Sequence, residues 1–392
     1  MKTKIFSWPK EIKVFWIVDF ILGLELIGPV LLIFFKDWGG LNQTETQTLQ
    51  SWFTLWIFIL EIPTGVFGDI KGKKKSVLLG YALMTIGTVI YTLTPNIYLF
   101  FFSEFVFALA IAFISGSKEA WMYDISQKYN LEEKFREIFA ISTKLHMLGM
   151  IVASGLFVLI NELLPVQVIF RIGAIFNVIA LILLAIFIKP TDGQKESLKP
   201  DYLLTVKKGV KILKESTNLK RLAIYTSLLA STSYFVIWLY QEALKVLSVP
   251  NSMFGVYRIV LLVGEIAALE IATRFLEKQN LKKSTLVIAL IIGVSFILGG
   301  LMQNVIGTLF VLLFAGGLGL QVSTLMSKEI NEEIDSKQRA TVLSFIGMAR
   351  RLTLTIFNPI IGFLVDSKGV FISFLILGIL SILAILFRPK KD

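Results

Sequence analysis

Long apolar runs recur along almost the whole chain, and they constrain its fold more than any other feature. A helix rises about 1.5 Å per residue, so roughly 20 apolar residues cross the hydrocarbon core of a bilayer. A helix satisfies its backbone hydrogen bonds within one segment, which a lone strand in lipid does not. Charged residues make up 17% of the chain, below the roughly 25% of a typical soluble protein. The sequence therefore predicts an all-α integral membrane protein in a lipid bilayer.

We count twelve apolar segments. They lie at residues 14–35, 50–69, 76–94, 97–116, 138–160, 167–188, 220–241, 252–274, 284–302, 306–327, 340–364 and 369–387. If they cross the membrane alternately, basic clusters fall on one side, whereas the other side holds only Lys36, Lys245 and Lys368. Loops rich in lysine and arginine stay in the cytoplasm. We therefore predict a multi-pass protein of the cell (inner) membrane with both termini cytoplasmic.

The longest polar connection, residues 189–219, divides these segments into six and six. Within it, residues 202–213 carry apolar side chains at helical spacing with lysines between them, which is typical of an amphipathic helix on a membrane surface. We therefore predict a six-helix bundle at 1–188, a cytoplasmic linker with an amphipathic helix at 189–219, and a second six-helix bundle at 220–392.

Composition excludes several functions. The formal net charge is +11, but the lysines lie at span ends and no polar domain presents a basic face to nucleic acid. With no cysteine and one histidine, His146, the chain lacks the residues for a disulfide, a thiolate metal site or a histidine metal site. We therefore predict no metal, no cofactor and no enzymatic activity. No phosphate-binding Gly-x-x-x-x-Gly-Lys-[Ser/Thr] loop is present, so no nucleotide-driven activity is predicted.

The predicted loop between spans two and three combines glycines, an acid and lysines. It contains Gly65, Asp69, Gly72, Lys73 and Lys74. Their order and place resemble the signature Gly-x-x-x-Asp-x-x-Gly-[Arg/Lys]-[Arg/Lys] of the major facilitator superfamily. This resemblance implies twelve transmembrane helices in two six-helix bundles, and a secondary active transporter that works by alternating access.

The same resemblance implies a cytoplasmic gate. In the family, the aspartate meets the positive N-terminal end of the eleventh span, which here begins near Arg339. Such a contact contributes up to about 2 kcal/mol when partly buried. Formed only in the outward-open state, it would bias the conformational equilibrium. The alternative interpretation is a plain basic cluster that ends a span.

The chain also departs from the family pattern. Ile70 follows the aspartate where a basic residue is usual, and Ser103-Glu104 stand where the fourth span usually has an arginine. The Gly-Pro motif of drug/proton antiporters is replaced by the segment 148–155, which has glycines and no proline. Residues 115–124 resemble a bacterial, drug-efflux-like branch of the superfamily.

Several acids fall inside predicted spans, where a charged side chain costs roughly 2.5–3.5 kcal/mol and usually faces a polar cavity. Glu25 lies near the middle of the first span and is followed by Gly28-Pro29, which can loosen the helix. We predict that it binds protons or substrate; the alternative is a neutral, hydrogen-bonded carboxyl group. The other candidates are Glu61, Glu104, Glu265 and Asp19. For Asp19, nearer the inner surface, a structural ion pair is the favoured interpretation.

Three arginines also lie inside predicted spans. Arg258 and Glu265 are seven residues apart and share one face of the eighth span. Arg350 and Arg351 fall near the middle of the eleventh span, and buried cations need counter-ions. We expect Glu265 to be their first partner, either in a functional site or as a fixed ion pair.

Aromatic residues near span ends are expected to form interfacial belts. Trp56, Phe235 and Trp238 are in addition candidates to line a pocket for a flat apolar ligand. The leading prediction is a monomeric, proton-coupled exporter (antiporter) of amphipathic or cationic small molecules, with sodium as the alternative coupling ion. An anionic nutrient or lipid-like metabolite is the alternative substrate class. A non-transporting receptor or scaffold is the alternative of another kind.

Overall fold

The computed structural model describes residues 8–191, 216–276, 279–334 and 339–389, except the side chains of 339–341 and 344. Every regular element in these ranges is a helix. Contacts divide the chain into two compact units, Met1–Gly40 with Trp52–Pro200 and Leu41–Ser51 with Asp201–Asp392. The amphipathic helix predicted at residues 202–213 lies outside the described residues.

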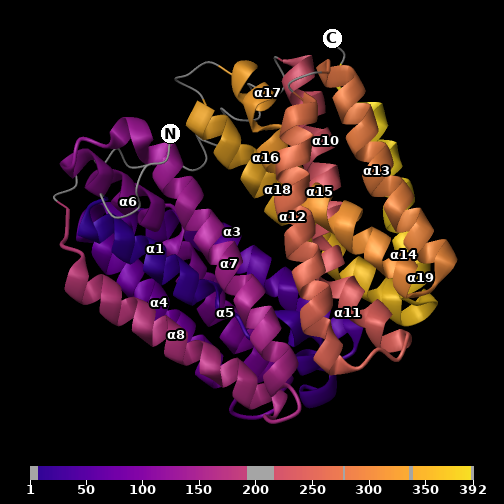
Figure 1. The fold of residues 1–392 in the computed structure, drawn as a ribbon, viewed down its shortest axis with the longest axis horizontal. Coiled ribbons are helices and arrows are strands. Elements are labelled where there is room, and N and C mark those ends of the chain that lie inside the picture. The colour runs from indigo at the N-terminus through magenta and orange to yellow at the C-terminus, as the bar shows by residue number, and fades with distance from the viewer. Residues whose placement is uncertain (1–7, 192–215, 277–278, 335–338, 390–392) are drawn as a thin grey trace. The chain divides into compact units, whose positions relative to one another are not determined.

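The helices of the first unit cover the first six predicted spans, and α6 and η4 lie between the fourth and the fifth (Figure 1). They are α1 (Lys10–Gly23), η2 (Gly28–Val30), α2 (Leu31–Ile33), η3 (Phe34–Trp38), α3 (Gln43–Lys71), α4 (Lys73–Tyr91), α5 (Ile97–Ile114), α6 (Ser117–Lys128), η4 (Glu132–Lys134), α7 (Phe135–Ile160) and α8 (Val166–Phe187). Residues 43–51 of α3 group with the second unit. The first predicted span is therefore not one helix, since α1 ends at Gly23 and the chain continues in short helical pieces.

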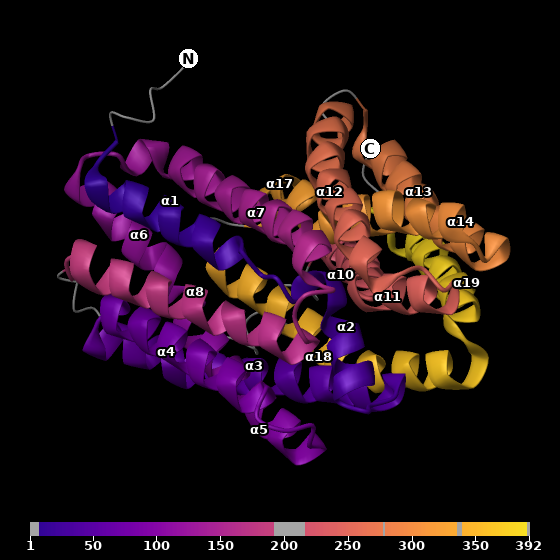
Figure 2. The same ribbon diagram turned by 60° about the horizontal axis from the view of Figure 1, so that its bottom comes forward.

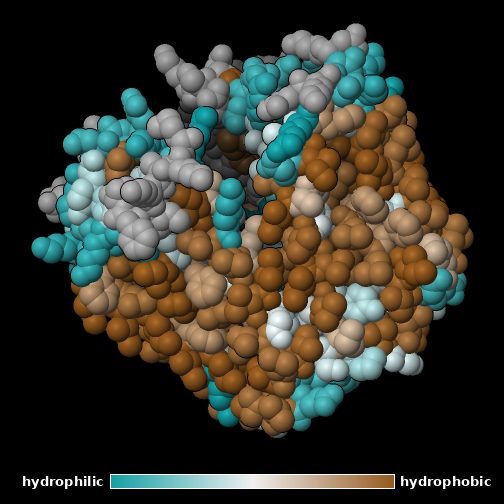
Figure 3. Space-filling view, viewed as in Figure 1, coloured by the Kyte–Doolittle hydropathy of each residue, from teal (hydrophilic) through white to brown (hydrophobic). Residues whose placement is uncertain are grey.

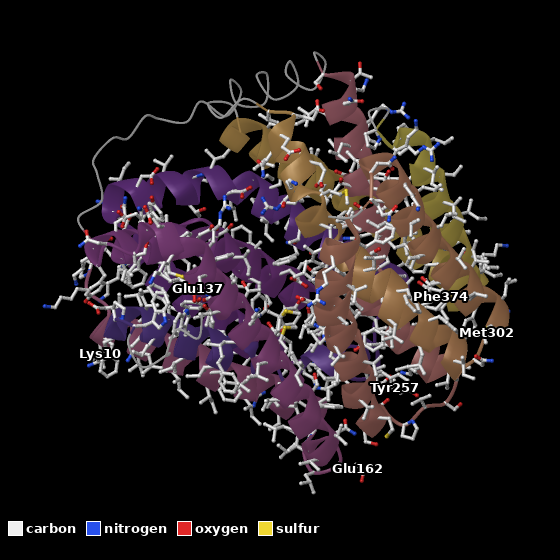
Figure 4. All side chains as sticks on the ribbon, turned by 45° about the horizontal axis from the view of Figure 1, so that its top comes forward. Lys10, Glu137, Glu162, Tyr257, Met302 and Phe374 are labelled. Carbon is white, nitrogen blue, oxygen red and sulfur yellow. The ribbon has the colours of Figure 1, made fainter. Side chains whose placement is uncertain are left out.

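Helices α1 and α7 pack closely against each other in the first unit and run in the same direction. The indole of Trp16 donates a hydrogen bond to the carbonyl oxygen of Ile138 (3.1 Å), and further along the pair Gly23 meets Gly149. Figure 4 shows Lys10 and Glu137 toward one end of this unit and Glu162 at the other. In Figure 2, α8 and α4 lie beside this pair in turn, and α5 packs on α4.

The second unit holds the remaining helices. They are α10 (Thr217–Tyr234), α11 (Val236–Val246), η5 (Asn251–Met253), α12 (Phe254–Leu276), α13 (Leu281–Met302), α14 (Val305–Phe310), η6 (Val311–Gly316), α15 (Gly317–Leu320), α16 (Val322–Leu325), α17 (Ser327–Glu332), α18 (Arg339–Lys368), α19 (Val370–Leu383) and η7 (Ala384–Phe387). Polar caps start several of them, because the side chains of Ser216, Asn280 and Asn304 accept hydrogen bonds from backbone N–H groups of the first turn.

Nine helical stretches among the described residues are long and apolar enough to cross a membrane. The helices outside this set include α4, which begins with three lysines, and α12, which contains Arg258 and Glu265. The tenth predicted span consists of shorter helical pieces between Val305 and Leu325. Apolar side chains cover much of the visible flank of each unit, while hydrophilic ones gather toward the ends (Figure 3). The structure thus supports a multi-pass membrane protein, and the count of twelve crossings stays a prediction.

Candidate functional site

Glu25 lies at the break in the first predicted span. After α1 ends at Gly23, the N–H of Glu25 bonds the Gly23 carbonyl oxygen (2.7 Å), and the helical pattern resumes only at Gly28. Pro29 lies in the short helix that follows, and the Glu25 side chain is exposed. A carboxylate inside a membrane segment is tolerated where it faces water or a polar cavity. Broken helices at membrane depth are common at transport sites.

The break follows the closest approach of two helices. A Cβ added to Gly149 of α7 would lie 2.9 Å from Cα of Gly23 in α1, so no side chain larger than hydrogen fits at this crossing. Gly155, two turns further along α7, has open space around it. The glycines of the segment 148–155 therefore have different roles, and only Gly149 sets the distance between α1 and α7.

Asp19 is the centre of a buried polar cluster one turn before that crossing. Its carboxylate accepts hydrogen bonds from the ammonium group of Lys118 and the hydroxyl of Ser142, and only 4% of the residue is exposed. Nδ1 of His146 lies 3.2 Å from the backbone carbonyl oxygen of Asp19, and Lys118 also bonds the Tyr81 hydroxyl. Lys118 of α6 and Ser142 of α7 thus bind the carboxylate of Asp19 directly, and the contact with Lys118 is an ion pair of the kind expected for Asp19.

Glu61 and Glu104 have different surroundings. Glu61 is half-buried in α3, two residues before Pro63, and its carbonyl oxygen accepts a bond from the Thr64 hydroxyl (3.2 Å). Glu104 of α5 is buried and faces the phenol of Tyr91, whose ring packs on Phe100. This acid of the fourth predicted span thus lies in an aromatic environment.

The signature loop is held inside the first unit by its lysines. The ammonium group of Lys73 bonds both carboxylate oxygens of Asp124 in α6 (2.8 Å each), and the Thr191 hydroxyl bonds the same carboxylate (2.9 Å). Lys74 donates to the carbonyl oxygens of Ala185 and Ile188 (2.7 and 2.6 Å), which end α8. Lysine is favourable there, because the C-terminal carbonyls of a helix carry partial negative charge.

The other signature residues stand apart from these contacts. Gly72 has a φ of 98°, which favours glycine, whereas Gly65 has open space for a side chain. Asp69 is exposed beside this loop. The side chain of Arg339, its expected partner, lies outside the described residues. Asp124 was not anticipated as a partner of Lys73, although it lies in the segment 115–124 that resembles the bacterial branch.

The acids and arginines of the second unit lie on several helices. The Glu265 carboxylate accepts a hydrogen bond from Gln321 (2.9 Å), at the junction of α15 and α16, and interacts electrostatically with the buried Arg258. Arg350 donates to the Ser323 hydroxyl (3.4 Å), and its neighbour Arg351 is also half-buried. The hydrogen bond to Glu265 thus comes from the Gln321 amide, which no sequence pattern singles out.

The three pocket aromatics belong to different units. Trp56 packs edge-on against Trp52 and Phe105 in the first unit, with ring centroids 5.4 and 4.8 Å apart. Phe235 and Trp238 are buried in the second unit, where Phe235 separates α10 from α11. A ligand pocket lined by these rings stays a prediction.

Comparison with known proteins shows which family the chain resembles in sequence. The family model of the Major Facilitator Superfamily matches residues 17–327. The MFS-type transporter MJ1560 of Methanocaldococcus jannaschii is 27% identical over 126 residues, which cover 32% of this chain and 32% of that protein. The chain thus aligns with about a third of the length of this curated relative.

Solved structures share the fold at low identity. A mutant of the nucleoside transporter NupG superposes with a TM-score of 0.79 at 14% identity, over 96% of this chain and 97% of that one. A POT family transporter in complex with 5-aminolevulinic acid gives a TM-score of 0.75 at 18% identity, over 97% and 96%. These identities show a common fold and nothing about substrate.

Proposed function

This chain belongs to the major facilitator superfamily of secondary transporters, and from that premise we propose that it exports amphipathic or cationic small molecules in exchange for protons. The observation that carries the proposal is the exposed Glu25 carboxylate at the break between α1 and η2. A carboxylate at membrane depth attracts a cation and can release it when a proton binds. The same group would therefore alternate between substrate and proton.

Coupling to protons fits the titratable groups inside the spans. The other acids are Asp19, Glu61, Glu104 and Glu265, any of which could carry a second proton. Exchange of one proton for one monovalent cation moves no net charge, so a second proton on one of these acids would let a membrane potential of 100 mV contribute about 2.3 kcal/mol to export. We propose protons as the driving ion, with sodium as the alternative, and a monomer in the inner membrane with cytoplasmic termini.

The signature loop supports a gate in this proposal. Lys73 and Lys74 hold the loop on α6 and α8, while the Asp69 carboxylate is exposed. An exposed anion on a fixed loop is positioned to bind a helix N-terminus in one conformation and release it in another. We propose that the start of α18, at Arg339, is that partner.

One observation favours a second candidate substrate class. The guanidinium group of Arg350 is half-buried and donates a bond of 3.4 Å to Ser323. Arginine binds carboxylate and phosphate groups through paired donors. Proton-coupled transport of an anionic nutrient or lipid-like metabolite is therefore the alternative, and a receptor or scaffold that transports nothing is the alternative of another class.

Transport assays separate these functions. An efflux-deficient bacterium that expresses the wild type should tolerate higher concentrations of amphipathic cations, and Glu25→Gln should remove the protection at equal membrane expression. In proteoliposomes, an imposed pH gradient should drive cation movement by the wild type alone. Movement of anions that requires Arg350 would favour the second candidate, and no movement of any solute would favour a receptor or scaffold.

A further inference from the structure

A cavity of about 310 Å³ lies beside Asp19 in the first unit. It is lined by α1, the junction of α5 with α6, and α7, and it opens to the surface; α1, α6 and α7 lie side by side in Figures 1 and 2. The helix is interrupted at this junction: α5 ends at Ile114, Gly116 has a φ of 72°, and α6 begins at Ser117. The cavity's polar lining includes Asp19, Lys118, Glu119, Ser142, Thr143 and His146.

The ion pair on the cavity wall is asymmetric. The Asp19 side chain is 5% exposed, whereas that of Lys118 is 22% exposed, so more of the lysine side chain than of the aspartate side chain borders the opening. Aspartate is short and held by Ser142 as well. Lysine is a point charge on a flexible stem, and Lys118 has a second hydrogen-bond partner in Tyr81. The ammonium group of Lys118 is therefore the member of the ion pair that another cation can replace.

The other residues that line the cavity favour a particular kind of ligand in place of the Lys118 ammonium group. Glu119 adds a second acid, so a cavity from which Lys118 has withdrawn is negatively charged. Nδ1 of His146 donates to a carbonyl oxygen, because a carbonyl oxygen can only accept. Ile114, Met122 and Phe139 supply apolar walls. A positive head and a short apolar body match this combination of groups.

We propose that this cavity binds small alkyl- or arylalkyl-ammonium cations, whose ammonium group replaces that of Lys118 on Asp19. The choice of a cation rests in part on the proposed function, whereas the site rests on the cavity and its ion pair. The volume is at the lower end of the roughly 300–1,000 Å³ of ligand pockets, so the ligand is a small amine rather than a large dye. Lys118 acts as a tethered competitor, present at a high effective concentration.

Protection of a single thiol tests occupancy in an otherwise native chain. The protein has no cysteine, and Thr143 lines the cavity with an exposed side chain, so Thr143→Cys gives one maleimide-reactive group there. Added 2-phenylethylammonium should slow labelling about fivefold at four times its Kd, because the rate falls as 1 + [L]/Kd. Neutral 2-phenylethanol should not slow it, nor should the cation protect Thr94→Cys, in the exposed loop between α4 and α5.

Chemical rescue tests the exchange itself. Lys118→Ala leaves the Asp19 carboxylate without its cation, so the variant should melt at a lower temperature than the wild type. Butylammonium, which reproduces the lysine side chain, should raise the Tm of this variant more than that of the wild type. Lys128→Ala is the matched control, because Lys128 is also in α6 and pairs with Glu11 (3.0 Å) away from the cavity. In Asp19→Asn with Lys118→Ala the rescue should disappear.

The outcomes are separable from those of the proposed function, because both measurements report binding without transport. Protection of Thr143→Cys by the cation together with rescue of Lys118→Ala supports the site, whether or not export is found. If Lys118→Ala does not fold, the thiol experiment decides alone. Equal labelling with and without the cation overturns the site, even if cation export through Glu25 is demonstrated.

Discussion

The carboxylate of Asp366, near the end of α18, caps the start of α3 through Thr44. It accepts hydrogen bonds from the backbone N–H and the hydroxyl of Thr44 (2.7 and 2.6 Å) and from the N–H of Gln43 (3.1 Å). All three residues belong to the second unit. The carboxylate thus satisfies two N–H groups that have no partner within their own helix, at its positive end.

Asp366→Ala should lower the free energy of unfolding by about 1 kcal/mol, the usual contribution of a helix cap. Thermal unfolding of the purified protein in detergent would show this as a lower Tm, and Asp366→Asn should give a smaller loss. Ser367→Ala is the control, because that exposed hydroxyl bonds only carbonyl oxygens of its own helix. Equal effects of the two alanine variants would contradict the cap.

Buried amides lie on the same pair of helices. The side chains of Gln47 in α3 and Asn358 in α18 are fully buried, and their amide atoms have no hydrogen-bond partner among the described residues. The hydroxyl of Ser51 bonds the carbonyl oxygen of Thr355 in the same region (2.6 Å). Burying an amide without a partner costs about 1–3 kcal/mol. Hydration of the contact between α3 and α18 in another state of the transport cycle would explain why polar residues occupy these two positions.

Asn358→Leu should therefore stabilise the state described here and slow transport. Its Tm should rise, because an apolar side chain of similar size has no unmet hydrogen bonds, while the transport rate should fall at equal membrane expression. Ser373→Ala, in α19, is a control for loss of a polar group that already has a partner. A lower Tm with unchanged transport would show that the amide is simply structural.

The sequence predicted the helices well because their signal is local. A run of about 20 apolar residues needs no information from elsewhere in the chain to predict a span. The break at Glu25 was anticipated only in part: Gly28-Pro29 indicated a loosened helix, but the helix already ends at Gly23. The contact that accompanies this end is with Gly149, a residue remote in sequence.

The partners of polar side chains were harder to predict than the positions of the helices, because partners depend on contacts between helices. The seven-residue spacing of Arg258 and Glu265 placed both on one helix face, and they do interact electrostatically. The hydrogen bond from Gln321 to Glu265 depends on the break between α15 and α16, which no local pattern marks. Polar side chains pair across helices, so their partners follow from packing rather than from spacing along one helix.

The crossing of α1 and α7 gives a prediction with an internal control. Gly149→Ala should destabilise the protein by about 1–3 kcal/mol, because the added methyl group meets backbone atoms of α1, which can yield only if the helices separate. Gly155→Ala, in open space on the same helix, should be neutral or slightly stabilising. Folded yield and Tm would compare the two, and similar losses from both would place the cost in the helix backbone instead.

The ion pair between Lys73 and Asp124 gives a charge-exchange prediction. Both side chains are about one-fifth to one-quarter exposed, so removing either should cost roughly 1–3 kcal/mol, between the values for exposed and buried pairs. Lys73→Asp and Asp124→Lys should each lower the Tm and transport, and the double variant should recover much of both. Lys75→Asp tests for a general charge effect. If the Tm and transport of the double variant are no higher than those of the single variants, the attraction between the two charges does not account for the losses.

Asp69 tests whether the signature loop is a gate as well as a fixed loop. Because its carboxylate is exposed, Asp69→Asn should change the free energy of unfolding by no more than about 0.5 kcal/mol, as for most surface substitutions. Transport should nevertheless fall, because the neutral amide binds the positive end of a helix less strongly than a carboxylate does. The comparison with Lys73→Asp is informative, since that variant should lose stability and transport together. Unchanged transport by Asp69→Asn at normal expression would remove the gate and leave the loop its role in joining α6 and α8.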